Sequence, residues 1–347
     1  MQASRASRAA ILAIAPLLLA GLASLLGGGP AGAAPEGSPW GRNYFPNVPL
    51  VTQDGEVVRF YDDVIANKVV AINFIFTSCS EVCPAETARM RQVYKLLGDR
   101  MGRDVFFTSI SIDPDHDTPE VLKAYREKFH IGAGLTFLTG KKEDVTLIRR
   151  KLGLRVDDAA PGGKRNDHAT SIVVGNESTA QWIRRSPFDN PRVLASLIGD
   201  RLHNWKYGNT IPGLASYAQA PRIESMERGE VLFRTRCSSC HTLGAGEAED
   251  AVGPDLLGVV DARGREWVGA WLTDPDRLID AKDPVALALV EKYRGLRMPD
   301  LSLGEAEVAS LVEFLESETQ RTLEARAAEE AAAAKAVAAD PHAHHHP

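Results

Sequence analysis

The chain has 347 residues, with 40 Lys and Arg against 46 Asp and Glu and a formal net charge of -6. This length suits two ordinary domains, and the lack of basic blocks argues against a nucleic-acid partner. The four cysteines form two close pairs far apart in the sequence, too few for a disulfide-stapled scaffold. We therefore predict that both pairs are functional thiols.

Residues 1–34 have the layout of an export signal. Arg5 and Arg8 precede an uncharged apolar run at 9–26, and Ala31-Gly32-Ala33 offers small residues for cleavage. The run is also about long enough to span a bilayer, so both a cleaved signal peptide and an N-terminal membrane anchor stay open. Either form places the rest of the chain on the periplasmic side of the cytoplasmic membrane.

Residues 35–205 show strands and helices in alternation. The turn signal Asp54-Gly55 indicates a short hairpin, and the apolar run 69–76 predicts a fully buried strand. Further strands are predicted at 105–112, 135–138 and 169–174, and helices at 85–97, after Thr118, at 143–152 and at 190–202. This order predicts an α/β layered domain with a mainly parallel centre.

The first cysteine pair, Cys79 and Cys83, lies where the buried strand at 69–76 ends. Pro84 suits the first turn of a helix, so both thiols are expected on a loop at a helix N-terminus, where backbone N–H groups favour thiolates. Three residues separate these cysteines, whereas thioredoxin-type redox motifs have two. His168 is the obvious third ligand, and two thiolates with an imidazole suit copper, Cu(I) in particular. A lone histidine beside a strand is more often structural, so this assignment depends on the wider pattern.

Residues 206–221 mix Gly, Pro, Ser and Tyr without periodicity and indicate an interdomain linker. The segment 222–318 is helical in pattern, with helices predicted at 224–236 and 305–318. The tail 319–347 is rich in Ala and Glu and is expected to be a solvated helix or disorder. Its closing histidines could gather metal ions, although a solvated tail is the favoured interpretation; they are His342, His344, His345 and His346.

The second cysteine pair belongs to the run Cys237-Ser238-Ser239-Cys240-His241, the C-x-x-C-H pattern of c-type haem attachment. The two thiols would add to the haem vinyl groups, and His241 would ligate the iron. The segment 224–318 resembles class I cytochromes c in its leading helix with Gly229 and Phe233, its Gly253-Pro254 loop, its Met298-Pro299 loop and its last helix with Phe314.

This resemblance implies one covalent haem with Met298 as the second axial ligand, a pair that suits electron transfer. Met226 falls on the leading helix and is expected to pack. The segment from Arg222 to Glu318 carries 11 Lys and Arg against 20 Asp and Glu, so electrostatic docking would prefer a basic partner. Three cations near Met298 form either a local basic rim or a solvated loop; they are Lys292, Arg294 and Arg297.

Three segments of the α/β domain together resemble the SCO/SenC family over about 47–203. They are residues 76–84 (FTSCSEVCP), 111–120 (SIDPDHDTPE) and Asp167-His168. The family implies a thioredoxin-like fold, copper bound by Cys79, Cys83 and His168, and a link to copper delivery for the binuclear copper centre of cytochrome c oxidase.

The acidic turn of the same resemblance contains Asp113 and Asp117, which either shape the copper site or cap a turn and a helix start. His116 departs from the family pattern, and it is expected on the surface together with His130.

The resulting hypothesis is an exported SCO-type copper metallochaperone whose fused haem keeps the copper or the cysteine pair reduced. Its expected partners are the copper-bearing subunit of cytochrome c oxidase or another apo-site dithiol, and a redox partner for the haem. Two alternatives stay open. One is an enzyme, a thiol–disulfide oxidoreductase that uses Cys79 and Cys83 with haem electrons. The other is a copper and haem electron carrier or redox sensor.

Overall fold

The computed structural model describes residues 40–80, 82–154, 171–203 and 226–339. The predictions for the segment 1–34, for His168, for the linker 206–221 and for the closing histidines fall outside these residues. Within the described ranges, no helix is long and apolar enough to cross a membrane.

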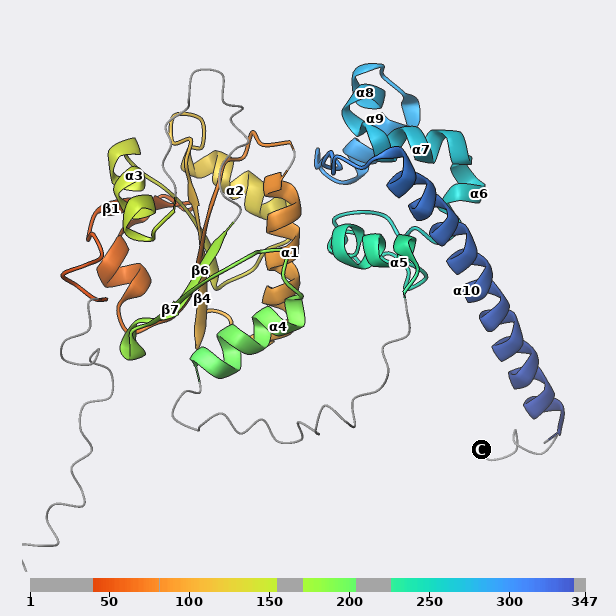
Figure 1. Cartoon of the computed structure of the whole chain (residues 1–347), viewed down its shortest axis with the longest axis horizontal. Helices are drawn as coiled ribbons and strands as arrows, with labels where there is room; N and C mark the ends of the chain where they lie inside the picture. Colours follow the sequence, from red (N-terminus) through yellow and green to blue (C-terminus); the bar gives the residue numbers. More distant parts are fainter. Residues whose placement is uncertain (1–39, 81, 155–170, 204–225, 340–347) are drawn as a thin grey trace, which may run out of the picture.

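A mixed seven-stranded sheet forms the first domain (Figure 1). Its central strands β3 (Val69–Ile75), β4 (Val105–Ser111) and β5 (Leu135–Thr139) are parallel, as the alternation of strands and helices predicts. The whole sheet has the strand order β2-β1-β5-β4-β3-β6-β7. Its outer strands are antiparallel to their neighbours; they are β1 (Pro49–Thr52), β2 (Val57–Arg59), β6 (Ile172–Asn176) and β7 (Gln181–Arg185). The expected hairpin is β1–β2, whereas β7 was not predicted.

Two helical layers cover this sheet. Helices α1 (Val82–Leu97), α2 (Pro119–Lys128) and α4 (Pro191–Ser196) lie on one face, and α3 (Lys142–Lys151) lies on the other (Figure 1). The helix expected at 190–202 divides into α4 and a wider turn at Leu197–Leu202. Shorter helical turns occur at Phe60–Ile65, Gly98–Arg100 and Glu177–Thr179.

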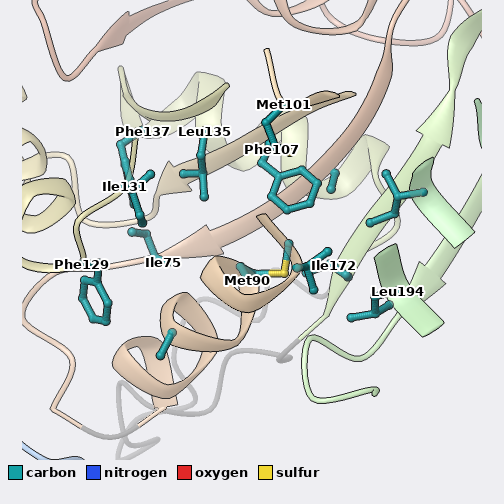
Figure 2. Packing of buried hydrophobic residues seen from close by; sticks show 14 of the residues in the cluster. Ile75, Met90, Met101, Phe107, Phe129, Ile131, Leu135, Phe137, Ile172 and Leu194 are labelled. Carbon is teal, nitrogen blue, oxygen red and sulfur yellow. The ribbon is translucent and has the colours of Figure 1, made fainter. Parts of the chain in front are cut away.

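Strand β3 is buried along its whole length because both helical layers pack against it. Its residues alternate between the two cores: Val69, Ala71 and Ile75 join one cluster, and Val70, Ile72 and Phe74 join the other. Figure 2 shows the first cluster, in which Met90 of α1 lies close to Phe107 of the sheet. The rigid sheet therefore determines where the residues after β3 emerge, including Cys79 and Cys83.

The second domain is helical. It contains α5 (Arg228–Leu232), which continues as a wider turn at Phe233–Cys237, followed by α6 (Val259–Arg263), α7 (Arg265–Thr273), α8 (Pro275–Asp280), α9 (Pro284–Lys292) and α10 (Glu305–Ala339). The helix predicted at 305–318 thus continues to Ala339, because the Ala- and Glu-rich sequence is strongly helix-forming and contains no helix breaker. After Thr319 its described side chains are almost all exposed, so the beginning of the tail is a solvated helix.

The packing of α5 on α10 depends on Gly229. A Cβ atom at this position would lie 2.1 Å from the backbone oxygen of Ser310 and 2.5 Å from Cβ of Phe314. We predict that Gly229→Ala forces these helices apart and lowers the free energy of unfolding of the second domain by about 1–3 kcal/mol. Chemical denaturation followed by circular dichroism measures the change.

Gly269 of α7 is the matched control, because its added Cβ would meet only Val308 Cγ1 at an ordinary 3.9 Å. Gly269→Ala should leave stability unchanged or raise it by about 0.4–1 kcal/mol. Equal losses in the two variants would contradict the close-packing role of Gly229.

Candidate metal and haem sites

The first cysteine pair is held between β3 and α1. Cys79 follows the strand, and Cys83 lies inside the first turn of α1 rather than on the loop before it. The backbone N–H of Cys83 donates a hydrogen bond to Cys79 Sγ over 3.4 Å, and the two residues are 0% and 5% exposed, respectively. All four cysteines of the chain lie in described segments, and none forms a disulfide. The pair is therefore a buried dithiol.

The protonation of this pair differs from the sequence expectation. The pKa of Cys83 is raised well above its usual value, first by its hydrogen bond to Cys79 and then by burial. The hydrogen bond to Cys79 and burial together therefore outweigh the helix N-terminus that was expected to favour a thiolate. A thiophilic metal ion would displace the thiol protons, since thiolates are the metal-binding form.

Asp117 attaches the cysteine loop to the end of β4. Its fully buried carboxylate accepts hydrogen bonds from the backbone N–H and the hydroxyl of Thr77, at 3.1 and 2.5 Å, and from the Ser111 hydroxyl at 2.5 Å. The carbonyl oxygen of Asp113 closes the same turn by accepting from the N–H groups of His116 and Asp117. Asp117 therefore shapes the site, and Asp113 supports the turn.

The histidines near this site have separate positions. His116 has a side chain 54% exposed, and its Nδ1 lies 2.9 Å from Asp117 Oδ1. His130 is only partly exposed, and burial and the charge of Arg294 lower its pKa. His168 lies outside the described residues. Within those residues, no group of three His, Cys, Asp or Glu side chains gathers as a metal site, so the third copper ligand stays a prediction.

Glu86 is a buried carboxyl group that sequence reasoning missed. It is 1% exposed on α1, one turn after Cys83, and one carboxyl oxygen accepts from Asn73 Nδ2 at 2.9 Å. Burial raises its pKa to about 8. The spacing of three residues from Cys83 was the available signal, because it places both residues on one helix face. Glu86 is thus a proton-holding group close to the dithiol.

The second cysteine pair lines a cavity of about 270 Å³. Cys237, Cys240, His241 and Met298 all contribute to its wall, so the structure brings together the four residues predicted to hold haem. Met226 is 48% exposed and does not line the cavity. Much of the remaining wall is apolar, with aromatic side chains that the sequence analysis did not assign: Trp267, Trp271 and Tyr293.

His241 is oriented for iron ligation. Its Nδ1–H donates to the carbonyl oxygen of Pro254 over 2.9 Å, which leaves Nε2 as the ligand atom. Burial lowers the pKa of the imidazole, so the neutral form is favoured. Gly253 allows the ring to come close, because a Cβ there would lie 2.8 Å from His241 Cε1.

The cavity fits a haem group. Imidazole and thioether donors suit haem iron, and two thiols of the C-x-x-C-H run suit covalent attachment. Trp267 Nε1 is buried and has no hydrogen-bond partner in the part of the chain that the structure describes, so it offers a donor to an acidic substituent. Trp267 stacks on Trp271 with ring centroids 5.3 Å apart and planes at 12°.

The two sites meet across the domain boundary. Pro84, Ala85 and Phe129 of the first domain contribute to the wall of the haem cavity. Helix α1 also binds the haem-motif segment: Arg89 donates to the carbonyl oxygen of Thr235, and Gln92 donates to that of Ser238, over 2.5 and 2.6 Å. Figure 1 shows α1 on the side of the sheet that faces α5.

Charge complementarity accompanies this contact. Asp250 of the second domain accepts from Arg91 and Lys95 of α1 at 2.6 and 2.5 Å. One acidic residue of the second domain is thus compensated by two cations of α1. Near Met298, Lys292 and Arg297 are paired with Glu247 and Asp276, respectively, so these two cations of the expected basic rim are compensated.

The fold and the two cysteine sites define a thioredoxin-like α/β domain followed by a helical cytochrome c domain. The SCO1/SenC family model matches residues 43–198, and the cytochrome c model matches residues 226–319. The chain therefore joins an SCO1/SenC domain to a C-terminal cytochrome c domain.

Relatives in other organisms match the SCO1/SenC part. An SCO2-like protein of Rickettsia felis is 35% identical over 105 residues, which cover 29% of this chain and 47% of that protein. The SCO1 homolog of Bacillus subtilis is 35% identical over 89 residues, covering 25% and 45%. The chain thus spans about half the length of these curated relatives.

Solved structures are similar over the same region. A SCO1/SenC family lipoprotein from Bacillus anthracis is 29% identical with a TM-score of 0.40, covering 49% of this chain and 99% of that chain. Yeast Sco1 with copper bound is 20% identical with a TM-score of 0.38, covering 48% and 92%.

We predict that Asp117→Ala loosens the cysteine loop. The substitution leaves the N–H and hydroxyl of Thr77 and the hydroxyl of Ser111 without their acceptor, which should lower the free energy of unfolding by about 1–3 kcal/mol. Denaturant titration measures the loss. Asp115→Ala in the same turn is the control, because Asp115 is exposed and its removal should cost less than about 0.5 kcal/mol. Equal losses of unfolding free energy in the two variants would show that Asp117 does not restrain the cysteine loop.

A second prediction concerns the pH dependence of stability through Glu86. Its native pKa of about 8 exceeds the ordinary value of 4.5, so the native state binds the proton more tightly than the unfolded chain. The contribution of Glu86 to the free energy of unfolding is fully present below about pH 4.5. It is lost as the pH rises to about 8, by up to about 1.4 kcal/mol per pH unit.

Glu86→Gln should remove this slope, because the amide stays neutral throughout. Guanidinium titrations between about pH 5 and pH 8 compare the variant with the parent protein. Glu127→Gln, at an exposed position of α2, should keep the parental slope. A parental slope in Glu86→Gln would show that Glu86 is ionised in the native state.

Proposed function

We propose that this protein is an exported copper metallochaperone for the copper centre of cytochrome c oxidase, in which a covalently bound haem c supplies electrons that keep the copper and cysteine site reduced. The observation that carries the proposal is the shared helix: α1 holds Cys83 in its first turn, and the next two residues, Pro84 and Ala85, form part of the haem cavity wall. Family membership supports the copper role, and residues 1–34 support export.

Copper is the cargo in this proposal, and the dithiol is its carrier. Cys79 and Cys83 bind Cu(I) only in the dithiol form, because a disulfide has no thiolate to offer. His168 is proposed as the third ligand, which completes a soft sulfur and nitrogen donor set. The acceptor is a dithiol of the copper-bearing oxidase subunit or of another apo-protein, to which Cu(I) passes by exchange of thiolate ligands.

The haem, when bound, supplies or accepts one electron at a time. His241 and Met298 hold its iron, and Cys237 and Cys240 form its covalent links. The chain's own part in the reduction is to hold the two groups close together. The buried dithiol ends at Cys83, and the next residues, Pro84 and Ala85, line the haem cavity. Reduction of Cu(II) to Cu(I) takes one electron, whereas reduction of a Cys79–Cys83 disulfide takes two electrons and two protons.

Glu86 favours a second candidate function, that of a thiol–disulfide oxidoreductase. Its raised pKa and its position one turn after Cys83 suit a group that holds a proton for the thiols. In this alternative Cys79, the more exposed of the two cysteines, attacks a substrate disulfide, and haem electrons regenerate the dithiol.

Replacement of His168 separates the two functions. We predict that His168→Ala lowers copper affinity at least about tenfold in the purified, reduced protein, because one of three ligands is lost, while disulfide reduction remains. Competition with a Cu(I) chelator measures affinity, and His116→Ala is the control at an exposed histidine. Unchanged copper affinity in His168→Ala would remove His168 from the site.

A deletion strain tests the physiological role. Loss of oxidase activity that added copper restores supports the metallochaperone. Restoration by a chemical reductant, without added copper, supports the oxidoreductase instead. The haem assignment is tested separately: after denaturation, the reduced protein should retain a covalent c-type spectrum, and Met298→Ala should lose the methionine-to-iron charge-transfer band.

A further inference from the structure

Helix α1 is buried on both sides over its N-terminal half. Met90 and Val93 pack into the cluster beneath the sheet, whereas Arg89 and Arg91 are covered although they are charged, with exposures of 3% and 6%. Arginine is rarely this buried without a compensating partner. The second domain provides the cover, since Arg89 and Arg91 bind Thr235 and Asp250 there.

The two arginines differ in how their charge is compensated. Arg91 shares the carboxylate of Asp250 with Lys95. Within the described segments, Arg89 donates only to neutral acceptors, the carbonyl oxygen of Thr235 and the side-chain oxygen of Gln92, and its buried Nε finds no partner there. Among the described residues, no carboxylate is paired with Arg89. It is therefore an uncompensated buried cation at the domain boundary.

This cation is close to the haem motif. Arg89 donates to the carbonyl oxygen of Thr235, two residues before Cys237, and Cys237 lines the cavity together with His241. A buried charge acts strongly on its neighbours, because the protein interior screens it less than water does. Oxidation of a haem adds one positive charge to the group, so Arg89 would disfavour the oxidised form.

We propose that the contact between α1 and the haem-motif segment is a redox-dependent dock, in which Arg89 makes the two domains bind more tightly when the haem is reduced than when it is oxidised. This inference rests on the haem of the proposed function and adds a regulation of the same site. Loss of one electron from the haem to Cu(II) at the cysteine pair gives Cu(I) and oxidised haem, and weakens the dock.

Separation of the two domains would expose the first turn of α1, which contains Cys83. Val252 of the second domain belongs to the same buried cluster as Cys79 and Cys83, and Pro84 and Ala85 are buried where they form the cavity wall. In the docked arrangement, Cys79 and Cys83 are at most 5% exposed. The chain thus reduces its cargo while docked and presents Cu(I) to an acceptor once oxidation of the haem has loosened the contact.

Thermodynamic linkage makes this proposal measurable without copper. If reduction strengthens docking, docking must raise the haem reduction potential by the equivalent factor. A tenfold change in the docking constant corresponds to about 59 mV for a one-electron couple. We expect Arg89→Gln to lower the midpoint potential of the full-length, haem-loaded protein by about this amount, as measured by spectroelectrochemical titration.

Two matched variants distinguish charge from structure. Arg89→Lys keeps the positive charge but loses the guanidinium geometry, and it should keep most of the potential. Arg100→Gln removes a cation of the same domain that pairs with Asp200 away from the dock, and it should leave the potential unchanged. Equal shifts in Arg89→Gln and Arg89→Lys, or in Arg89→Gln and Arg100→Gln, would overturn the role assigned to the charge of Arg89.

Small-angle X-ray scattering of the full chain tests docking itself. The radius of gyration should be smaller with ascorbate-reduced haem than with ferricyanide-oxidised haem, and this difference should shrink in Arg89→Gln. Asp250→Asn, which removes the charge shared by Arg91 and Lys95, should enlarge the reduced form. Identical scattering in both redox states would overturn the dock. A protein without a c-type spectrum would instead refute the proposed function.

Discussion

The arrangement of both sites depends on the burial of one helix on two sides. Helix α1 contributes Met90 and Val93 to the core beneath the sheet, and Arg89, Arg91 and Gln92 to the contact with the cytochrome c domain. Because β3 is buried along its length, the point at which α1 begins is determined by the sheet. The same packing therefore positions the dithiol and one wall of the haem cavity.

Buried polar groups give this arrangement its specificity. The carboxylate of Asp117 accepts hydrogen bonds from Thr77 and Ser111 and restrains the loop before Cys79. Glu86 and Arg89 are less completely satisfied, since each has a buried polar atom without a hydrogen-bond partner among the described residues. Such groups cost folding free energy, and they are found where a protein needs a shifted pKa or a local field. Here both residues lie on α1, between the Cys79–Cys83 dithiol and the cavity of the second domain.

The domain order, the parallel centre of the sheet and four residues of the cavity wall, Cys237, Cys240, His241 and Met298, could be predicted from sequence. Alternating strand and helix patterns identify β3, β4 and β5, and the C-x-x-C-H run identifies His241. Strand β7 was missed, because Gln181–Arg185 contains too few apolar residues to stand out. The continuation of α10 was left open, since its Ala- and Glu-rich sequence favours a helix but offers no core to confirm it.

The sequence by itself determined the chemistry: two thiol pairs, a histidine after one of them, and a methionine before the last long helix, because these depend on residue types and local spacing. Only the tertiary structure decided which residues lie between the two sites. Arg89 bonds to Thr235 over a sequence separation of 146 residues. Asp117 bonds to Thr77 over a separation of 40 residues. No local pattern encodes such pairs: the first forms where α1 is enclosed between the sheet and the second domain, and the second joins the segments that follow the neighbouring strands β3 and β4.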